Sequence, residues 1–183
     1  QGILLLKSQN VTISSNLIFN NSKEGIAVNI SNFTLIINNT IKNNIISGIS
    51  IFGANYSKII NNSIFKSLYG IYIEDTEGLS ILSNEPISNN SKFGIYATES
   101  LNSTISGNTI LNNSDAGIIL LNSINNTIRN NMIYNNSLAG IRLNSSNYTI
   151  IESNNLTYNG GMTVSSNIAN IIIFESSDNN MTN

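Results

Sequence analysis

Glycine recurs along this chain at an almost constant interval, and each of these glycines precedes a pair of aliphatic residues spaced two apart. The eight anchor positions are Gly2, Gly25, Gly48, Gly70, Gly94, Gly117, Gly140 and Gly161. The intervals between them are 23, 23, 22, 24, 23, 23 and 21 residues. A period of about 20–50 residues is the signature of a repeat architecture whose units stack on their neighbours. The regular interval therefore excludes a disordered Asn-rich tract, which the composition alone would allow.

Aliphatic residues occupy four fixed places in the repeat, at one, three, eleven and sixteen residues after the glycine. The column at eleven is Ile throughout: Ile13, Ile36, Ile59, Ile81, Ile105, Ile128, Ile151 and Ile172. In the 24-residue repeat, an insertion at Glu85-Pro86 brings Ile87 into register with the column at sixteen. In the last repeat, Met162 and Val164 hold the first two aliphatic places. Period-two spacing of β-favouring residues predicts three short strands per repeat.

These patterns predict an all-β fold, a right-handed parallel β-helix solenoid of about eight coils of roughly 23 residues. Parallel crossover connections are nearly always right-handed, and stacked strands lie about 4.8 Å apart. A leucine-rich repeat has a similar period, but its Leu-x-x-Leu-x-Leu pattern does not appear. We expect residues 1–183 to form a single domain that is a segment of a longer protein.

Asparagine forms a column of its own, fourteen residues after the glycine. Its members are Asn16, Asn39, Asn62, Asn84, Asn108, Asn131 and Asn154, and Glu175 takes the place in the last repeat. We expect this column to lie at a turn and to form a ladder, because stacked Asn amides can bond to one another. A second Asn pair recurs near the end of several coils, as in Asn20-Asn21. The anchor glycines are expected to form a turn before the first strand, where a β-carbon would crowd the chain.

The low charge of the chain excludes several classes of partner. Charged residues make up 10%, the net charge is −2, and only eight residues are basic. Nucleic-acid binding requires a basic surface, so we expect no nucleic-acid partner. The longest aliphatic runs are four residues, as in residues 3–6, whereas a membrane helix needs about 20. No membrane span is therefore expected.

The Asn-x-Ile-x-x-Asn and Gly-Ile-x-Ile repeats resemble the NosD-type, pectin-lyase-like family of right-handed parallel β-helices, over essentially the whole chain. Their Asn- and Ile-rich style is similar to that of archaeal adhesin-like surface proteins. The resemblance implies functions from polysaccharide lyases, hydrolases and epimerases to surface proteins and a periplasmic protein of copper-site assembly. For copper, the chain departs from the family: it has no His or Cys, and its methionines are Met132, Met162 and Met181. We expect no metal site of this kind.

One group of residues on the predicted outer face of coils four and five could carry chemistry. Its members are Tyr72, Glu74, Asp75, Glu77, Tyr96 and Glu99, with Arg142 facing the same way two coils further on. We predict that these residues contact a carbohydrate or Ca²⁺, the one cofactor considered; a plain surface remains the alternative. Asp75 and Glu99 stack in adjacent coils, so they are the catalytic candidates if the chain is an enzyme, since retaining glycosidases hold two carboxyls about 5–5.5 Å apart.

The glycosylation pattern Asn-x-Ser/Thr occurs sixteen times, about twice the number expected by chance from 37 Asn and a Ser and Thr fraction of 39 in 183. The candidate acceptors are Asn10, Asn32, Asn55, Asn102, Asn125, Asn147 and Asn155.

Together these features predict a non-enzymatic module that is extracellular or at the cell surface, adhesin-like or part of a surface layer, and that bears glycan or binds carbohydrate. The first alternative is a polysaccharide-active lyase, hydrolase or epimerase that uses the acidic and Tyr face of coils four and five. The second is a filament or sheath module that self-associates end to end through open solenoid ends.

Overall fold

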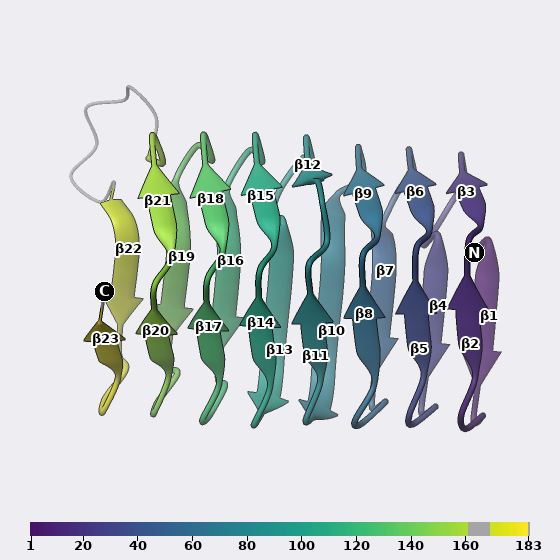
Figure 1. Ribbon diagram of the computed structural model, residues 1–183, viewed down its shortest axis with the longest axis horizontal. Coiled ribbons are helices and arrows are strands. Elements are labelled where there is room, and N and C mark those ends of the chain that lie inside the picture. The colour runs from purple at the N-terminus through teal and green to yellow at the C-terminus, as the bar shows by residue number, and fades with distance from the viewer. Residues whose placement is uncertain (161–168, 183) are drawn as a thin grey trace.

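The computed structural model describes residues 1–160 and 169–182, which form an all-β, right-handed solenoid of three parallel sheets (Figure 1). Sheet A contains β1 (Ile3–Leu6), β4 (Ile26–Asn29), β7 (Ser47–Phe52), β10 (Tyr69–Glu77), β13 (Ile95–Leu101), β16 (Ala116–Leu121), β19 (Ala139–Asn144) and β22 (Ala169–Phe174). Sheet B contains β2 (Thr12–Ser14), β5 (Leu35–Ile37), β8 (Lys58–Ile60), β11 (Ser80–Leu82), β14 (Thr104–Ser106), β17 (Thr127–Arg129), β20 (Ile150–Glu152) and β23 (Asn180–Thr182). Sheet C contains β3 (Leu17–Phe19), β6 (Thr40–Lys42), β9 (Ser63–Phe65), β12 (Ile87–Ser88), β15 (Thr109–Leu111), β18 (Met132–Tyr134) and β21 (Asn155–Thr157).

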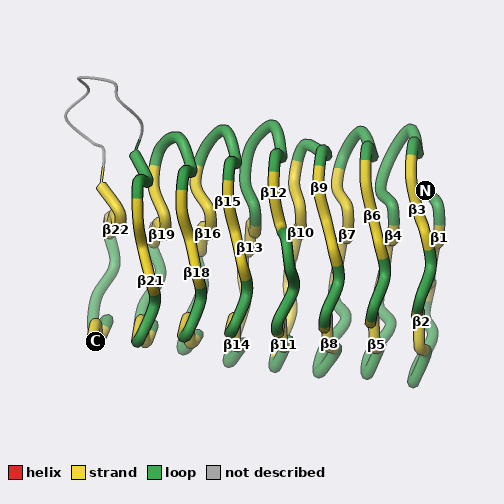
Figure 2. The backbone as a smooth tube through the Cα atoms, turned by 45° about the horizontal axis from the view of Figure 1, so that its top comes forward, coloured by secondary structure: helices red, strands yellow, loops and turns green. Residues whose placement is uncertain are grey.

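Each of the first seven coils contributes one strand to each sheet in the order A, B, C, and the described part of the last coil contributes β22 and β23. The coils stack along the long axis (Figure 2). Strand register follows the sequence columns, as in Ile71 paired with Ile49 and Ile95. Ile87 pairs with Ile64 and Ile110, so the insertion at Glu85-Pro86 is accommodated between the ladder turn and β12. The predicted fold and its three strands per coil are confirmed. In residues 1–160 and 169–182, no helix is long and apolar enough to cross a membrane.

The core is a single column of aliphatic side chains that runs through the centre of the solenoid. The four inward positions of each central coil are buried, and in coil three they are Ile49, Ile51, Ile59 and Ile64. Each β-branched side chain stacks on its counterpart in the next coil, which suits the pleated surface of a strand. The inward positions of the strands are therefore all occupied by core residues, and only the outward positions are free to vary.

The anchor glycines are required by close approach and not by a turn conformation. Gly48 and Gly70 lie within β7 and β10, and none of the anchors described has a positive φ. A β-carbon on Gly94 would lie 2.7 Å from the carbonyl oxygen of Gly117 and 2.6 Å from Cγ2 of Ile110. The predicted crowding is thus present. The predicted turn is absent at Gly48, Gly70, Gly117 and Gly140, which lie within strands, whereas Gly25 and Gly94 lie at a bend directly before β4 and β13.

The predicted asparagine ladder is confirmed at the turn between sheets B and C. Nδ2 of Asn108 donates to Oδ1 of Asn131 at 3.0 Å and to the carbonyl of Ile81 at 2.9 Å. Oδ1 of Asn108 accepts from the backbone N–H of Asn84 at 2.9 Å. The same pattern runs through Asn16, Asn39, Asn62, Asn84, Asn108, Asn131 and Asn154. Side-chain amides therefore satisfy buried backbone groups that a sharp turn would otherwise leave without partners.

A second ladder lies at the turn between sheet C and sheet A of the next coil. It contains Asn21, Asn44, Asn90, Asn113, Asn136 and Asn159. In coil three, Ser67 replaces the expected Asn, and its backbone N–H still donates to Oδ1 of Asn90 at 3.0 Å. The shorter side chain does not reach Asn44, so Nδ2 of Asn44 and Oγ of Ser67 are buried without a hydrogen-bond partner. This gap is the weak point of the second ladder.

The sequence predicted that the last coil begins at Gly161, and the strand register shows that this prediction was wrong. Ile141 pairs with Ile171 and Arg142 with Ile172, so Asn170 takes the anchor place, 30 residues after Gly140. Ile172 therefore faces outward beside Arg142 instead of filling the core, and Glu175 lies at the bend after β22 instead of at the ladder turn. The predicted positions Gly161, Met162 and Val164 lie outside the described residues.

The physical reason for this register lies in the side chains of the turns. Three consecutive isoleucines, 171–173, present an aliphatic residue in either alignment, so hydrophobicity alone does not distinguish them. The observed register lets the backbone N–H of Ser146 donate to Oγ of Ser176 at 2.8 Å and that of Thr149 donate to Oδ1 of Asn179 at 2.7 Å. In this alignment the buried backbone N–H groups of the turns therefore have hydrogen-bond acceptors.

We expect Asn108→Leu to lower the free energy of unfolding, because it leaves the buried amide groups of Asn84 and the carbonyl of Ile81 unsatisfied, at about 1–3 kcal/mol for each group. Asn29→Leu is the matched control, since Asn29 lies half-exposed at the end of β4 outside both ladders. Thermal unfolding of the two variants measures the difference. Equal melting temperatures would contradict the importance of the ladder.

Ser67→Asn is expected to stabilise the chain, because it restores the missing rung and gives Nδ2 of Asn44 an acceptor. One additional buried hydrogen bond contributes about 1 kcal/mol, which raises the Tm of a chain of this size by about 2–4 °C. Ser67→Ala serves as the control for a change at the same position without an amide. A Tm of Ser67→Asn at or below that of Ser67→Ala would contradict the claim that a missing amide at this position weakens the second ladder.

Candidate functional site

The outer face of sheet A carries a group of aromatic side chains in coils four and five. Tyr72 of β10 pairs in register with Tyr96 of β13, and both side chains point outward because they alternate with the core residues Ile71 and Ile95. Their rings stack with centroids 5.3 Å apart and an interplanar angle of 5°. The pair forms a flat, half-exposed apolar surface along the solenoid axis.

Two further rings extend this surface toward the start of the strands. Tyr69 and Phe93 stand one residue before their anchor glycines, and their rings stack with centroids 6.0 Å apart. Phe93 lies 5.5 Å from Tyr96, and Tyr69 lies 5.5 Å from Tyr72, again between centroids. We call these four residues the aromatic platform. Sequence reasoning missed Tyr69 and Phe93, although residues directly before an anchor glycine form a column that continues with Ala116 and Ala139.

A carboxylate lies at the edge of the platform and is bonded to it. The hydroxyl of Tyr72 donates to Oε2 of Glu74 at 2.9 Å. Burial raises the pKa of Tyr72 above its ordinary value, and the hydrogen bond to Glu74 raises it further. Burial also raises the pKa of Tyr96, with a smaller contribution from the neighbouring Tyr69. Both phenols therefore remain protonated hydrogen-bond donors at neutral pH.

Lys92 lies beside the platform, and the charges of Lys92 and Arg142 both act on Asp115. The ammonium of Lys92 lies 5.9 Å from the ring centre of Tyr69. Burial raises the pKa of Asp115, while the charges of Arg142 and Lys92 act in the opposite direction. Oδ1 of Asp115 and Nε of Arg142 are buried without a hydrogen-bond partner in the described part of the chain. Sequence reasoning predicted Arg142 but missed Lys92 and Asp115.

Arg142 is separated from the platform by one strand. Ile119 of β16 pairs with Tyr96 on one side and with Arg142 on the other. The outward row of sheet A therefore reads Tyr72, Tyr96, Ile119 and Arg142 in successive coils. This row combines two aromatic rings, one aliphatic side chain and one cation at intervals of about 4.8 Å.

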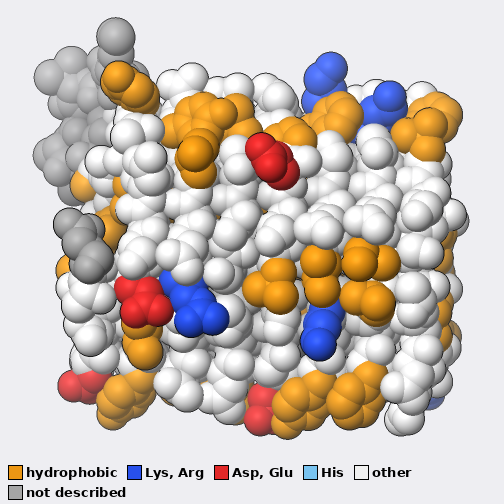
Figure 3. Space-filling view, in the orientation of Figure 1, with side chains coloured by type: hydrophobic (Ala, Val, Ile, Leu, Met, Phe, Trp, Pro, Cys, Tyr) orange, Lys and Arg blue, Asp and Glu red, His pale blue; other side chains and the backbone are white. Residues whose placement is uncertain are grey.

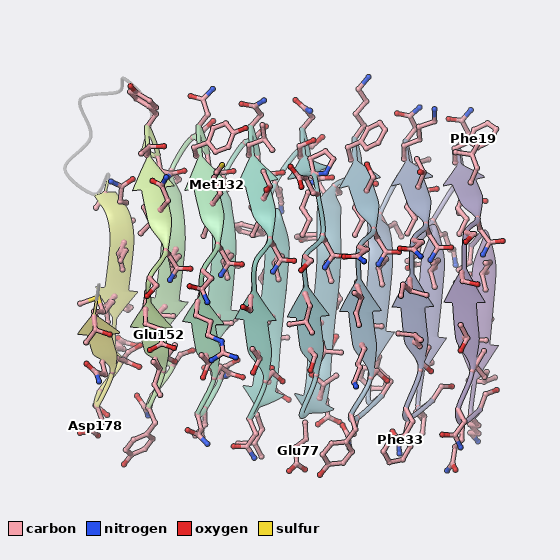
Figure 4. All side chains as sticks on the ribbon, viewed as in Figure 1. Phe19, Phe33, Glu77, Met132, Glu152 and Asp178 are labelled. Atoms are coloured by element: carbon pink, nitrogen blue, oxygen red, sulfur yellow. The ribbon has the colours of Figure 1, made fainter. Side chains whose placement is uncertain are left out.

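The acidic residues predicted from the sequence do not form one cluster. Glu74 lies on the platform, whereas Asp75 and Glu99 are exposed at the same bend of adjacent coils, each with φ of 52°. Glu77 lies beyond the bend, near the turn that leads to sheet B (Figure 4), where its Oε1 accepts from Nδ2 of Asn102 at 3.5 Å. Its carboxylate raises the pKa of Tyr56 through a hydrogen bond. In residues 1–160 and 169–182, no three His, Cys, Asp or Glu side chains gather as a metal site.

The face formed by sheets B and C is poor in charge. Figure 3 shows mostly uncharged polar side chains there, with only scattered acidic and basic groups. In the described residues one ion pair is present, between Arg129 and Glu152 at 3.9 Å, and both side chains are substantially exposed. Exposed pairs of this kind contribute little. Aromatic and charged groups come together on the sheet A face, and on sheet C the ammonium of Lys42 lies 5.8 Å from the ring centre of Phe19.

Six of the seven glycosylation candidates lie at the turn between sheets A and B, and the seventh lies on a strand. Asn10, Asn102 and Asn125 lie at the turn between sheets A and B with φ between 52° and 55°. Asn32, Asn55 and Asn147 occupy the position one residue earlier in the same turn, and Asn155 begins β21. All seven are at least partly exposed, so their modification stays a prediction.

Asp115 gives the stability a pH dependence whose sign follows from its raised pKa. Its protonated form is favoured in the folded chain, so its contribution is present below the ordinary pKa of an Asp and is lost as the pH rises through the folded pKa. We expect the Tm of Asp115→Asn, relative to that of the parent chain, to rise between pH 3 and pH 7. Thermal unfolding at both pH values measures this, and a difference that is constant or falls with pH would contradict it.

Comparison of the fold with solved structures finds similar right-handed solenoids. The A-module of a mannuronan C-5 epimerase from Azotobacter vinelandii is 16% identical with a TM-score of 0.77, over 95% of this chain and 54% of that one. The pectate lyase Pel9A is 13% identical with a TM-score of 0.59, over 90% and 51%. PfbA, a surface adhesin of Streptococcus pneumoniae, is 14% identical with a TM-score of 0.61, over 96% and 61%.

At these identities the likeness concerns the fold alone, and the chain spans about half to three fifths of the length of these structures. No curated protein matches the sequence. Two family models do match: a right-handed β-helix region over residues 69–183, and the periplasmic copper-binding protein NosD over residues 1–102.

The side chains present do not fit the copper named in the NosD description. Copper sites use imidazole and soft sulfur ligands, and the sequence has no His or Cys. Met132 is exposed on sheet C (Figure 4) and Met181 lies on β23 of sheet B, while Met162 is outside the described residues. Each family match nevertheless covers more than half of the chain. The chain therefore belongs to the right-handed β-helix family and, over residues 1–102, to the NosD family.

Proposed function

We propose that this chain is a non-catalytic, carbohydrate-binding β-helix module that works outside the cytoplasm, in the periplasm or at the cell surface. The observation that carries the proposal is the aromatic platform, with Tyr72 and Tyr96 stacked 5.3 Å apart and Tyr72 bonded to Glu74.

The chemistry of the platform matches that of a polysaccharide. The C–H faces of a pyranose ring pack well on a flat aromatic surface, and its hydroxyls need donors and acceptors at the rim. The phenols supply donors, and the carboxylate of Glu74 supplies acceptors. The aromatic rings are aligned with the solenoid axis, so an extended chain of sugars lies along several coils. Ile119 and Arg142 continue the same row and would contact the next sugars.

The proposed location is supported by the family and by the neighbours. NosD is described as periplasmic, and PfbA is described as a surface adhesin. The epimerase and the pectate lyase are named for polysaccharides. Carbohydrate binding by this chain is the common element that the platform and these names support. Contact of Ca²⁺ with the acids of coils four and five, and association end to end, stay predictions.

A polysaccharide-modifying enzyme is the second candidate. It is favoured by Asp115, whose carboxyl has a raised pKa and is flanked by the charges of Lys92 and Arg142 beside the platform. Raised pKa values of partly buried acids occur at catalytic sites, and they also occur in structural networks. The catalytic roles predicted for Asp75 and Glu99 belong to this candidate.

The platform is tested by affinity electrophoresis of the full chain in gels that contain alginate, polygalacturonate or a neutral β-glucan. We expect at least one of these polymers to retard the parent chain. Tyr96→Ala should weaken that retardation about tenfold, since loss of a stacked ring removes about 1.4 kcal/mol. Tyr158→Ala is the matched control, because Tyr158 is exposed at a different turn.

The same samples distinguish the two candidates. Retardation by none of the three polymers, or equal retardation of Tyr96→Ala and the parent chain, would falsify the binding proposal. Depolymerisation or epimerisation of a retarding polymer, followed by NMR and lost in Asp115→Asn, would replace the proposal with the enzyme.

A further inference from the structure

The segment between sheets A and B contains two residues with left-handed backbone in each coil, such as Lys7 and Asn10 in the first. The second residue of each pair forms a column of its own. This first-turn column, eight residues after each anchor, consists of Asn10, Phe33, Tyr56, Gly78, Asn102, Asn125, Tyr148 and Asp178. Positive φ suits Gly, Asn and Asp, whereas for a bulky residue it is an outlier. Phe33, Tyr56 and Tyr148 are therefore the wrong residue type for the backbone that they occupy.

Burial does not compensate for this strain. Phe33, Tyr56 and Tyr148 are 53%, 48% and 55% exposed. Phe33 and Tyr56 stack on each other with centroids 5.7 Å apart, and the ring of Tyr56 lies over Gly78. Among the described residues, Tyr148 has no aromatic partner at all. The backbone strain at these residues is not offset by burial of their rings in the folded chain. Strain of this kind indicates a function for the rings.

These rings coincide with a second pattern. In the same three coils, the residue before the ring is Asn32, Asn55 or Asn147, and the residue after it is Thr34, Ser57 or Thr149. In the other coils the residue before the column is Gln9, Glu77, Leu101, Ile124 or Ser177. At this position of the first turn, the Asn-x-Ser/Thr pattern and the strained aromatic residue therefore occur together in three coils, and neither occurs there without the other.

The amides of these asparagines are held by their oxygen alone. Oδ1 of Asn32 accepts from the backbone N–H of Asn55 at 2.9 Å, and Oδ1 of Asn147 accepts from that of Ser177 at 2.8 Å. Within the described residues their Nδ2 atoms donate no hydrogen bond. In contrast, Nδ2 of the ladder residue Asn39 donates to Ile13, Ile37 and Asn62. A substituent on Nδ2 of a first-turn asparagine therefore leaves the hydrogen bonds of that turn intact. The same substituent on Nδ2 of a ladder asparagine would break the hydrogen bonds of the ladder.

We propose that the first turn is a row of N-glycan attachment sites at Asn32 or Asn55 and at Asn147, in which the first sugar packs on the adjacent aromatic ring. The donor is a polyprenyl (di)phosphate-linked oligosaccharide. Nδ2 forms a bond to C1 of the sugar and loses one proton, while the bond from C1 to the phosphate oxygen breaks and the lipid (di)phosphate leaves with the electron pair. Oδ1 remains an acceptor throughout.

The structure also places this modification before folding. Thr34 and Ser57 are 1% exposed and Thr149 is 0% exposed, so the hydroxyl that completes each attachment pattern is inaccessible once the coils have closed. Asn32 and Asn55 lie in adjacent coils about 4.8 Å apart. Two glycans would collide at that spacing, so each molecule carries one at this pair. Asn147 is four coils away and is modified independently.

The inference rests on the extracytoplasmic location in the proposed function and is tested separately from sugar binding, which is measured on unglycosylated chain from bacteria. The full chain is secreted from yeast beside a glycoprotein that reports an active transferase, and modified peptides are mapped by mass spectrometry. We expect glycan on Asn147 and on one of Asn32 and Asn55. Incubation of folded, unglycosylated chain with oligosaccharyltransferase and lipid-linked donor should leave Asn147 at least tenfold less modified than in denatured chain.

Tyr148→Asn tests the role of the ring, because it keeps the attachment pattern and restores a residue that tolerates the left-handed backbone. We expect it to lower the Tm of the glycosylated chain by about 2–4 °C and not to lower that of the unglycosylated chain. Asn147→Gln should abolish this difference. Unmodified Asn147 in secreted chain, equal modification of folded and denatured chain, or the same effect of Tyr148→Asn with and without glycan would each overturn the proposal.

Discussion

The hydrogen bond from one coil to the amide oxygen of an asparagine in the next is the interaction on which the rest of this solenoid depends. At the turn between sheets B and C the backbone changes direction within two residues and cannot continue the ladder of a sheet. The Asn side chain supplies the missing partner there, since its Oδ1 accepts from a backbone N–H while its Nδ2 donates to carbonyls and to the next rung. The three sheets can therefore close around a core of four inward side chains per central coil. Where Ser67 interrupts the second ladder, two polar atoms are buried without partners.

This construction separates the residues that make the fold from those that can carry function. Inward aliphatic residues, anchor glycines and ladder asparagines meet the same surroundings in every coil, so they scarcely vary. Outward positions meet solvent, and there the coils differ. The aromatic platform, the charges of Lys92, Asp115 and Arg142, and the rings of the first turn all stand at such positions. Membership of the NosD family accordingly describes the scaffold, while the copper named for that family finds no imidazole or thiolate in this chain.

The two surfaces proposed to meet sugars differ in physical character. The platform is built on extended strands, where aromatic residues are favoured, and its rings are half-buried by their neighbours. The rings of the first turn stand on left-handed backbone that disfavours them and remain about half-exposed. The sheet thus favours the rings of the first surface, whereas the backbone disfavours those of the second, and this strain is the observation from which the glycan is proposed.

The coil period, the three strands per coil, the core columns and the first asparagine ladder could all be predicted from the sequence. The reason is that each inward position needs the same type of side chain in every coil, so that type recurs at a fixed interval in the sequence. Which outward residues meet could be seen only in the folded chain. Tyr69 and Phe93 lie beside Tyr72 and Tyr96, Lys92 lies over Tyr69, and the predicted acids are divided between a face, a bend and a turn. The tertiary structure also decided the register of the last coil, where three consecutive isoleucines satisfy either alignment and the partners of the turn amides distinguish them.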